Sequence, residues 1–168
     1  MTDPRSGIPS SSGRTGTTPQ TAGYTRGGEA LTPERRARLA YEAFNERDIE
    51  MALDQNRDDV EVLDQATGQR FAGREGARRF MQQWLDAFPD AKCLVTNVVG
   101  AGDTVVVEFR AQGTNTGPLA TPEGPIPPTG KRAEVAMCDV LEFSGGRVAR
   151  QRTYYDVGSL LRQLGIGG

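Results

Sequence analysis

The stretch RAEVAMCDVLEF, residues 132–143, alternates apolar and polar side chains along most of its length. Because successive side chains of a strand point to opposite faces of a sheet, this period predicts one long strand with a core face and a solvent face. Arg132, Glu134, Cys138 and Glu142 fall in the solvent phase. The core phase contains Ala133, Val135, Met137, Leu141 and Phe143.

Asp139 also falls in the apolar phase of this strand. A carboxyl on a core face must be paired, hydrogen-bonded or neutral, and desolvation raises its pKa. A carboxyl with a raised pKa is suited to general acid–base catalysis near neutral pH. Asp139 is therefore a candidate catalytic residue. The alternative is a structural aspartate that is held by a backbone amide or by an arginine.

The same two-residue period continues on both sides of this stretch. It predicts strands over residues 94–99, 104–112 and 147–155, with turns at 101–103 and 144–146 and a long Pro/Gly loop at 117–130. In the second of these strands Phe109 lies in the inward phase. In the last strand a bulge would reverse the phase, so the inward residues among Thr153, Tyr154, Tyr155 and Asp156 stay open.

Helical spacing dominates the first half of the chain. Thr32 and Pro33 are typical of a helix start, and Leu39, Ala40, Ala43 and Phe44 form the expected apolar stripe. Asp48 is expected to cap a second short helix, a strand follows around residues 60–63, and a third helix, which includes Trp84, covers 74–88. A last short helix takes 159–164. Helices and strands are largely segregated, which predicts an α+β fold with a curved sheet wrapped on helices.

Composition limits the chemistry. The 168 residues include no histidine and two cysteines, so a histidine-based triad is excluded and no metal site is expected. The 20 basic and 22 acidic residues do not favour nucleic acid as a partner. The chain has no apolar run long enough for a membrane span or a secretory signal, so we expect a cytoplasmic protein.

Residues 1–30 are rich in Gly, Ser, Thr and Pro and offer little apolar surface to offset the entropy of ordering them. We expect a disordered tail over 1–30 and one domain over 31–168.

Two further polar residues are candidates. Asp64 follows the first predicted strand and comes just before the turn at residues 66–68, where aspartates often only accept hydrogen bonds from turn amides. If Asp64 lies beside Asp139, two carboxyls in different environments supply an acid and a base without histidine. Asn115 continues the inward phase of its strand and is a candidate to orient a substrate oxygen, or it shapes the turn around it.

Several short motifs resemble the SnoaL-like polyketide cyclases, which share a cone-shaped fold with nuclear transport factor 2 and ketosteroid isomerase. The motifs are FAGREGA (71–77), AFPD (87–90), GTNTG (113–117), IPPTG (126–130), GGRV (145–148) and LRQLG (161–165). The resemblance implies a curved mixed sheet wrapped on the N-terminal helices and a cofactor-free reaction. It also implies an acid at the position of Thr153, a histidine at Asp139 and an asparagine at Asp64, and this chain departs from all three.

The resemblance and the strand phase together predict a cofactor-independent cyclase or isomerase that acts on an apolar substrate, with Asp64 and Asp139 as acid and base. A pair of acids in such a cone is similar to the cyclases that form ether or pyran rings. The expected substrate-binding residues are Asn115, Thr153, Tyr155, Trp84, Met137 and Phe109. Alternatives are an epoxide hydrolase or hydroxylase-like relative, and a non-catalytic binding or partner subunit. The loop at 117–130 is expected to cover the pocket or to pack in a homodimer interface.

Overall fold

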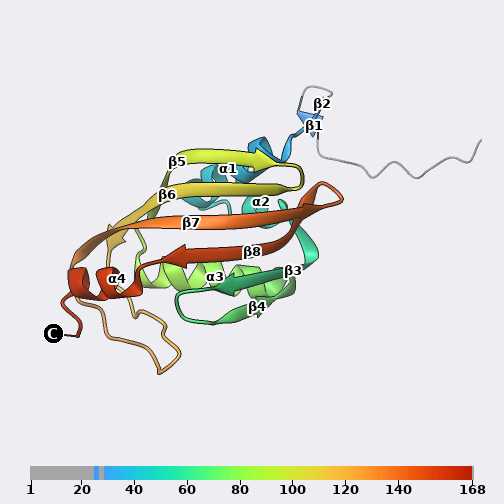
Figure 1. Cartoon of the computed structure of the whole chain (residues 1–168). Coiled ribbons are helices and arrows are strands. Elements are labelled where there is room, and N and C mark those ends of the chain that lie inside the picture. Colours follow the sequence, from blue (N-terminus) through green and yellow to red (C-terminus); the bar gives the residue numbers. More distant parts are fainter. Residues whose placement is uncertain (1–24, 27–28, 168) are drawn as a thin grey trace, which may run out of the picture.

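A six-stranded curved sheet forms the centre of the fold in the computed structural model, which describes residues 25–26 and 29–167 (Figure 1). The strand order is β4-β3-β8-β7-β6-β5, and only the pair β3 and β8 is parallel. The strands are β3 (Asn56–Asp64), β4 (Arg70–Ala72), β5 (Lys92–Ala101), β6 (Thr104–Thr114), β7 (Arg132–Ser144) and β8 (Arg147–Tyr155).

Four helices complete the domain: α1 (Pro33–Glu46), α2 (Ile49–Leu53), α3 (Gly73–Ala87) and α4 (Val157–Leu164). Side-chain caps start two of them as predicted. The Thr32 hydroxyl accepts a hydrogen bond from the Arg35 amide at 3.1 Å, and the Asp48 carboxylate accepts one from the Met51 amide at 3.0 Å. Each such cap satisfies an amide that has no partner within its helix.

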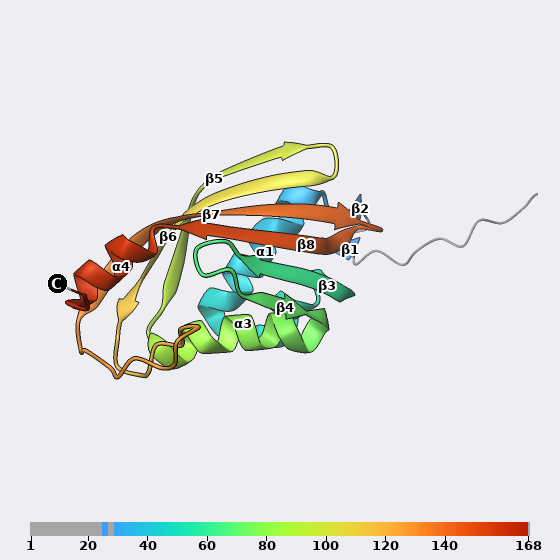
Figure 2. The same cartoon turned by 60° about the horizontal axis from the view of Figure 1, so that its bottom comes forward.

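The helices cover the concave face of the sheet. Helix α1 packs against β5 and β6, and α3 packs against β3 and β4, while α4 follows β8 at one end (Figure 2). The α+β class and the curved mixed sheet wrapped on helices are confirmed. The central core of buried apolar side chains includes Leu53, Val60, Val62, Phe80, Val105, Val107, Leu141 and Phe143.

The inward phase predicted for β7 is confirmed, because Ala133, Val135, Asp139, Leu141 and Phe143 are all buried. In β8, Val148 pairs with Phe143, and Arg150 pairs with Glu142, so Ala149 is an extra residue. This bulge reverses the phase of the second half of the strand. It turns Thr153 inward and leaves Tyr154 41% exposed, which settles the orientation that the sequence left open.

Three details differ from the expectations. The short strand β4, which pairs with β3, was not predicted. On α1, Ala43 of the expected stripe is buried and Ala40 and Phe44 line the cavity described below, but Ala37 and Tyr41 take the place of Leu39 on that wall. Most of the segment expected to be disordered lies outside the described residues, although β1 (Thr25–Arg26) pairs with β2 (Glu29–Ala30).

Candidate active site

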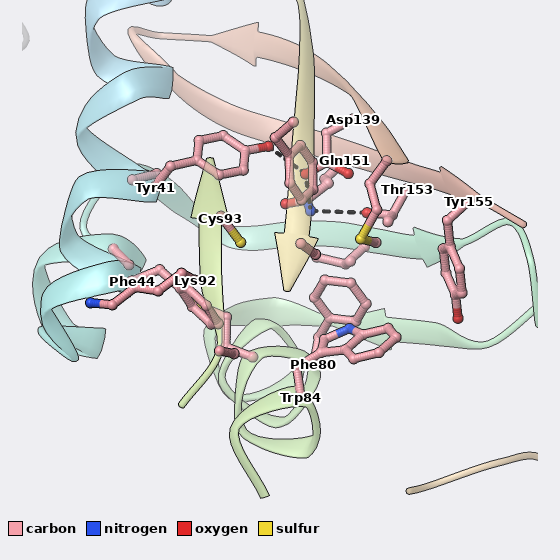
Figure 3. A pocket seen from close by; sticks show the side chains of 18 of the residues that line it. Tyr41, Phe44, Phe80, Trp84, Lys92, Cys93, Asp139, Gln151, Thr153 and Tyr155 are labelled. Atoms are coloured by element: carbon pink, nitrogen blue, oxygen red, sulfur yellow. Dashed lines mark hydrogen bonds between the residues drawn. The ribbon is translucent and has the colours of Figure 1, made fainter. Parts of the chain in front are cut away.

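An apolar cavity of about 150 Å³ lies between the concave face of the sheet and helices α1 and α3 (Figure 3). Most of its wall is aromatic or aliphatic. Asp139 is the only carboxylate among the residues that line it, and Lys92 is the only basic residue. The sequence-predicted residues that line it are Phe109, Met137, Asp139, Thr153, Tyr155 and Trp84.

Asp139 lies on this wall with its two oxygens in different situations. Oδ2 accepts a hydrogen bond of 2.5 Å from the Tyr41 hydroxyl and one of 3.2 Å from the Gln151 amide. Oδ1 is buried and has no hydrogen-bond partner, the one such side-chain atom in the described part of the chain. The Gln151 amide also donates to the Thr153 hydroxyl at 3.1 Å, as drawn in Figure 3.

Burial raises the pKa of Asp139 to about 6. Desolvation is the largest cause, because the charged form loses the stabilisation of water. The hydrogen bond from Tyr41 favours the carboxylate and lowers the pKa, the neighbouring Thr153 hydroxyl acts in the same direction, and the negative charge of Asp64 raises the pKa. The pKa of Tyr41 is itself raised, mainly by burial and next by Asp139, so Tyr41 stays a neutral donor.

Asp64 lies in the same row of the sheet as Asp139, because both pair with Thr153, one from β3 and the other from β7. It does not line the apolar cavity. Its Oδ1 accepts from the turn amides of Ala66 and Thr67 at 3.0 and 3.2 Å, and its Oδ2 accepts from the Tyr155 hydroxyl at 3.1 Å.

The expectation that the two carboxyls share one cavity is therefore corrected. The amides of the turn after β3 donate hydrogen bonds to the Asp64 carboxylate, and Tyr155 lies between this carboxylate and the cavity. Neither carboxyl forms an ion pair with an arginine among the described residues.

Asn115 also lies outside this cavity. Its buried side chain donates to the carbonyls of Ala87 and Gly117, and it accepts hydrogen bonds from the amide and the hydroxyl of Thr129. The expectation that Asn115 orients a substrate oxygen is corrected, since these bonds occupy its amide in fixing both ends of the loop at 117–130. The turn-shaping alternative describes its position.

Sequence reasoning missed Tyr41 and Gln151. Tyr41 has a signal, because the spacing 37, 40, 41 and 44 is that of one helix face. Gln151 shares the phase of Thr153 and Tyr155 once the bulge is placed. Cys93 also lines the cavity, and burial raises the pKa of its thiol to about 12, so it is no nucleophile near neutral pH.

Potential metal ligands do not gather at one place in the described part of the chain. Within residues 25–26 and 29–167, no group of three or more cysteine or acidic side chains is placed to hold a metal ion. Over the same residues, no helix combines the length and the apolarity that a membrane span needs.

The family model of the SnoaL-like polyketide cyclases matches residues 35–164. The chain belongs to this family. The match runs from the first turn of α1 to the end of α4, so the cavity and Asp139 lie within the SnoaL-like domain. None of the curated proteins compared with this chain is similar enough to count as a match.

Among solved structures, IdmH of Streptomyces antibioticus, a candidate polyketide cyclase, is 28% identical with a TM-score of 0.68; the similarity covers 81% of this chain and all of IdmH. TsrD of Streptomyces laurentii is 26% identical with a TM-score of 0.66, over 77% of this chain and 92% of TsrD. AclR of Streptomyces galilaeus, a candidate hydroxylase, is 20% identical with a TM-score of 0.68, over 79% of this chain and 95% of AclR. At that identity AclR shows the SnoaL-like fold alone.

Proposed function

We propose that this SnoaL-like protein is a cofactor-independent cyclase or isomerase in which Asp139 is the general acid–base for an uncharged, apolar, polyketide-like substrate. The observation that carries the proposal is the buried Oδ1 of Asp139, which has no hydrogen-bond partner although Asp139 lines the apolar cavity. A buried acceptor without a hydrogen bond is costly, and a substrate proton would satisfy it.

The two oxygens of Asp139 would have different roles. Tyr41 and Gln151 hold Oδ2 and so fix the plane of the carboxylate, which leaves Oδ1 to take a proton. In ring closure, a substrate hydroxyl or acidic C–H gives its proton to Oδ1, and the freed electron pair forms the new ring bond. The proton then passes from Asp139 to the substrate atom that has gained negative charge. The product is an isomer, and the step needs no co-reactant.

The electrostatics of the site support this role. With a pKa of about 6, Asp139 populates both protonation states near neutral pH, as an efficient general acid–base does. A bound apolar substrate would displace water from this wall, which would strengthen the interaction of the carboxylate with a developing charge. Thr153, Tyr155, Trp84, Met137 and Phe109 would contact the substrate. Asp64 would hold the turn after β3 and the Tyr155 hydroxyl in place and would take no part in the proton transfer.

The proposal is tested with 5-nitrobenzisoxazole, a small neutral aromatic probe. A base that removes its C–H proton breaks its N–O bond and releases a coloured cyanonitrophenolate. We expect the wild-type protein to accelerate this ring opening and Asp139→Asn to lose about 10² to 10⁴ of the acceleration. Asp58→Asn is the matched control, because Asp58 is exposed on β3. Equal rates in the wild type and Asp139→Asn would refute Asp139 as the base.

Isotopically labelled water separates the cyclase from the hydrolase alternative once a substrate is found. An intramolecular cyclase incorporates no oxygen from water into its product, whereas an epoxide hydrolase incorporates one atom. Label in the product would overturn the cyclase and keep Asp139 as a base that activates water.

A further inference from the structure

A second cavity, of about 320 Å³, lies beside the first and outside the site described above. It is enclosed by the end of β3, by α3 and α4, and by the loop between β6 and β7, which runs close to α4 in Figure 1. We call it the outer cavity; it is lined by Asp64, Ala66, Thr67, Gln69, Gln83, Trp84, Leu119, Ala120, Thr121, Pro122, Glu123, Ile126, Tyr155, Val157, Leu160 and Leu161.

The wall between the two cavities consists of side chains. Trp84, Tyr155 and Leu160 line both of them. The ring of Tyr155 meets that of Trp84 edge-on, with centroids 5.6 Å apart, and its hydroxyl donates to Asp64 Oδ2. The hydrogen bond to Asp64 is the single side-chain bond that fixes the Tyr155 ring in the described structure. A rotation of this ring would break this hydrogen bond and the edge-on contact with Trp84, and it would remove the side chain that separates the two cavities.

The loop between β6 and β7, which forms the outer wall, is held in place by hydrogen bonds and by packing. The buried Asn115 ties its two ends to the domain through the carbonyls of Ala87 and Gly117 and through Thr129. Leu119 and Ile126 bond to each other through both backbone amides, at 2.9 and 2.8 Å. Leu119 is buried in a cluster with Ala87, Phe88, Leu160 and Leu164. The loop thus presents a defined surface to a ligand.

The lining of the outer cavity differs in chemistry from that of the inner one. It offers amide and hydroxyl groups from Thr67, Gln69, Gln83 and Thr121, beside the ring of Trp84. No lysine or arginine is among its lining residues, whereas Asp64 and Glu123 are. Phosphates and carboxylates are therefore disfavoured, and groups that both donate and accept hydrogen bonds are favoured.

We propose that the outer cavity is a subsite for the uncharged, hydroxylated end of an elongated substrate whose apolar part lies against Asp139. This inference rests on the proposed function for the role of the inner cavity. On binding, the Tyr155 ring turns aside, and a substrate hydroxyl replaces the Tyr155 hydroxyl as the donor to Asp64 Oδ2. The exchange keeps the buried carboxylate of Asp64 hydrogen-bonded, so it leaves no unsatisfied charge.

The test measures binding by calorimetry and needs no turnover. Its probes are 2-naphthol, which has only the apolar part, and 2-naphthyl β-glucoside, which adds a neutral hydroxylated end. We expect the wild type to bind the glucoside about tenfold more tightly than the naphthol, since each added hydrogen bond contributes modestly. Ala120→Trp, which fills the outer cavity from the exposed loop, should abolish this preference and leave naphthol binding unchanged.

A matched pair of variants on α3 locates the contact. Gln83 lines the outer cavity, whereas its neighbour Gln82 is exposed and bonds to Asp86. Gln83→Ala should lower glucoside affinity about threefold to fivefold, and Gln82→Ala should not change it. Equal affinity of the wild type for both probes, or an unchanged preference in Ala120→Trp, would overturn the proposal. Tighter binding of 2-naphthyl phosphate than of the glucoside would also overturn it.

The outcome is separable from that of the proposed function. Asp139→Asn should keep the preference for the glucoside, because the variant changes only the inner cavity. Ring opening of 5-nitrobenzisoxazole that depends on Asp139, without any preference for the glucoside, would leave the proposed function standing and remove the outer subsite.

Discussion

Asp139 and Asp64 are neighbours across Thr153 on one face of the sheet, and both are almost completely buried, at 3% and 1% exposure. Their surroundings differ. Both oxygens of Asp64 accept hydrogen bonds, from turn amides and from Tyr155. Asp139 has two donors on one oxygen and none on the other.

Burial alone therefore does not make a carboxyl reactive. A buried carboxylate whose two oxygens both accept hydrogen bonds is part of the structure. A buried carboxylate with one oxygen that lacks a donor, in a residue beside an apolar cavity, is suited to accept a proton.

The largest effect is expected on catalysis. Asp139→Asn should lose about 10² to 10⁴ of the acceleration of 5-nitrobenzisoxazole ring opening, whereas Asp64→Asn should stay within about threefold of the wild type. The reason is that, of the two residues, only Asp139 lines the inner cavity. Initial rates at pH 7 provide the measurement, and an equal loss in both variants would mean that the two acids work as one unit.

The second effect is expected on stability, with opposite signs for the two residues. The pKa of Asp139 is about 6 in the folded protein and about 3.9 in an unfolded chain, so the free energy of unfolding falls as pH rises between these values. The loss approaches about 3 kcal/mol above pH 6. Asp139→Asn removes this cost, so it should be more stable than the wild type at pH 7 and lose its advantage near pH 4.

Asp64→Ala should instead be less stable than the wild type by about 2 kcal/mol, because it leaves the two turn amides and the Tyr155 hydroxyl without an acceptor. Urea unfolding at several pH values measures both differences. If Asp139→Asn proves less stable than the wild type at pH 7, the carboxyl is stabilised rather than strained by its surroundings.

Tyr41→Phe is expected to have a smaller effect with a diagnostic pH dependence. The Tyr41 hydroxyl lowers the pKa of Asp139, so its removal should raise that pKa further above 6. Less of Asp139 is then ionised at pH 6, so ring opening should slow there by up to about tenfold and recover toward pH 9. A uniform loss at every pH would indicate that Tyr41 only packs against Phe109.

The smallest effect is expected for Tyr155→Phe. The variant cuts the hydrogen bond between Asp64 and the wall of the inner cavity, and we expect a stability loss of about 1 kcal/mol with an unchanged pH profile of ring opening. A change of the profile as large as that of Tyr41→Phe would show that Asp64 reaches the reaction through Tyr155. The paired-acid hypothesis would then return.

Strand periodicity located Asp139 correctly, because the sequence alone shows a polar residue at a position where the alternation predicts an apolar one. It also limited β8 to two alternatives, but only the pairing with β7 shows where the bulge lies. Tyr41 meets Asp139 across 98 positions of sequence, and no local pattern encodes that contact.

Asp64 and Asn115 show the opposite case. Both were found by local rules, and local rules also describe what they do: they hold a turn and a loop. Placing them in the cavity required knowledge of where their side chains find donors and acceptors. That knowledge depends on groups brought by other strands and helices.

The most direct test of the central claim is a titration of the side-chain carboxyls by ¹³C NMR in the wild type and in Asp139→Asn. We predict one resonance in the wild type with a midpoint near pH 6, because burial raises the pKa of Asp139 to about 6, and we predict that Asp139→Asn lacks this resonance. A spectrum in which the resonance lost in Asp139→Asn has its midpoint below about pH 4.5, near the ordinary range of an aspartate, would contradict the account.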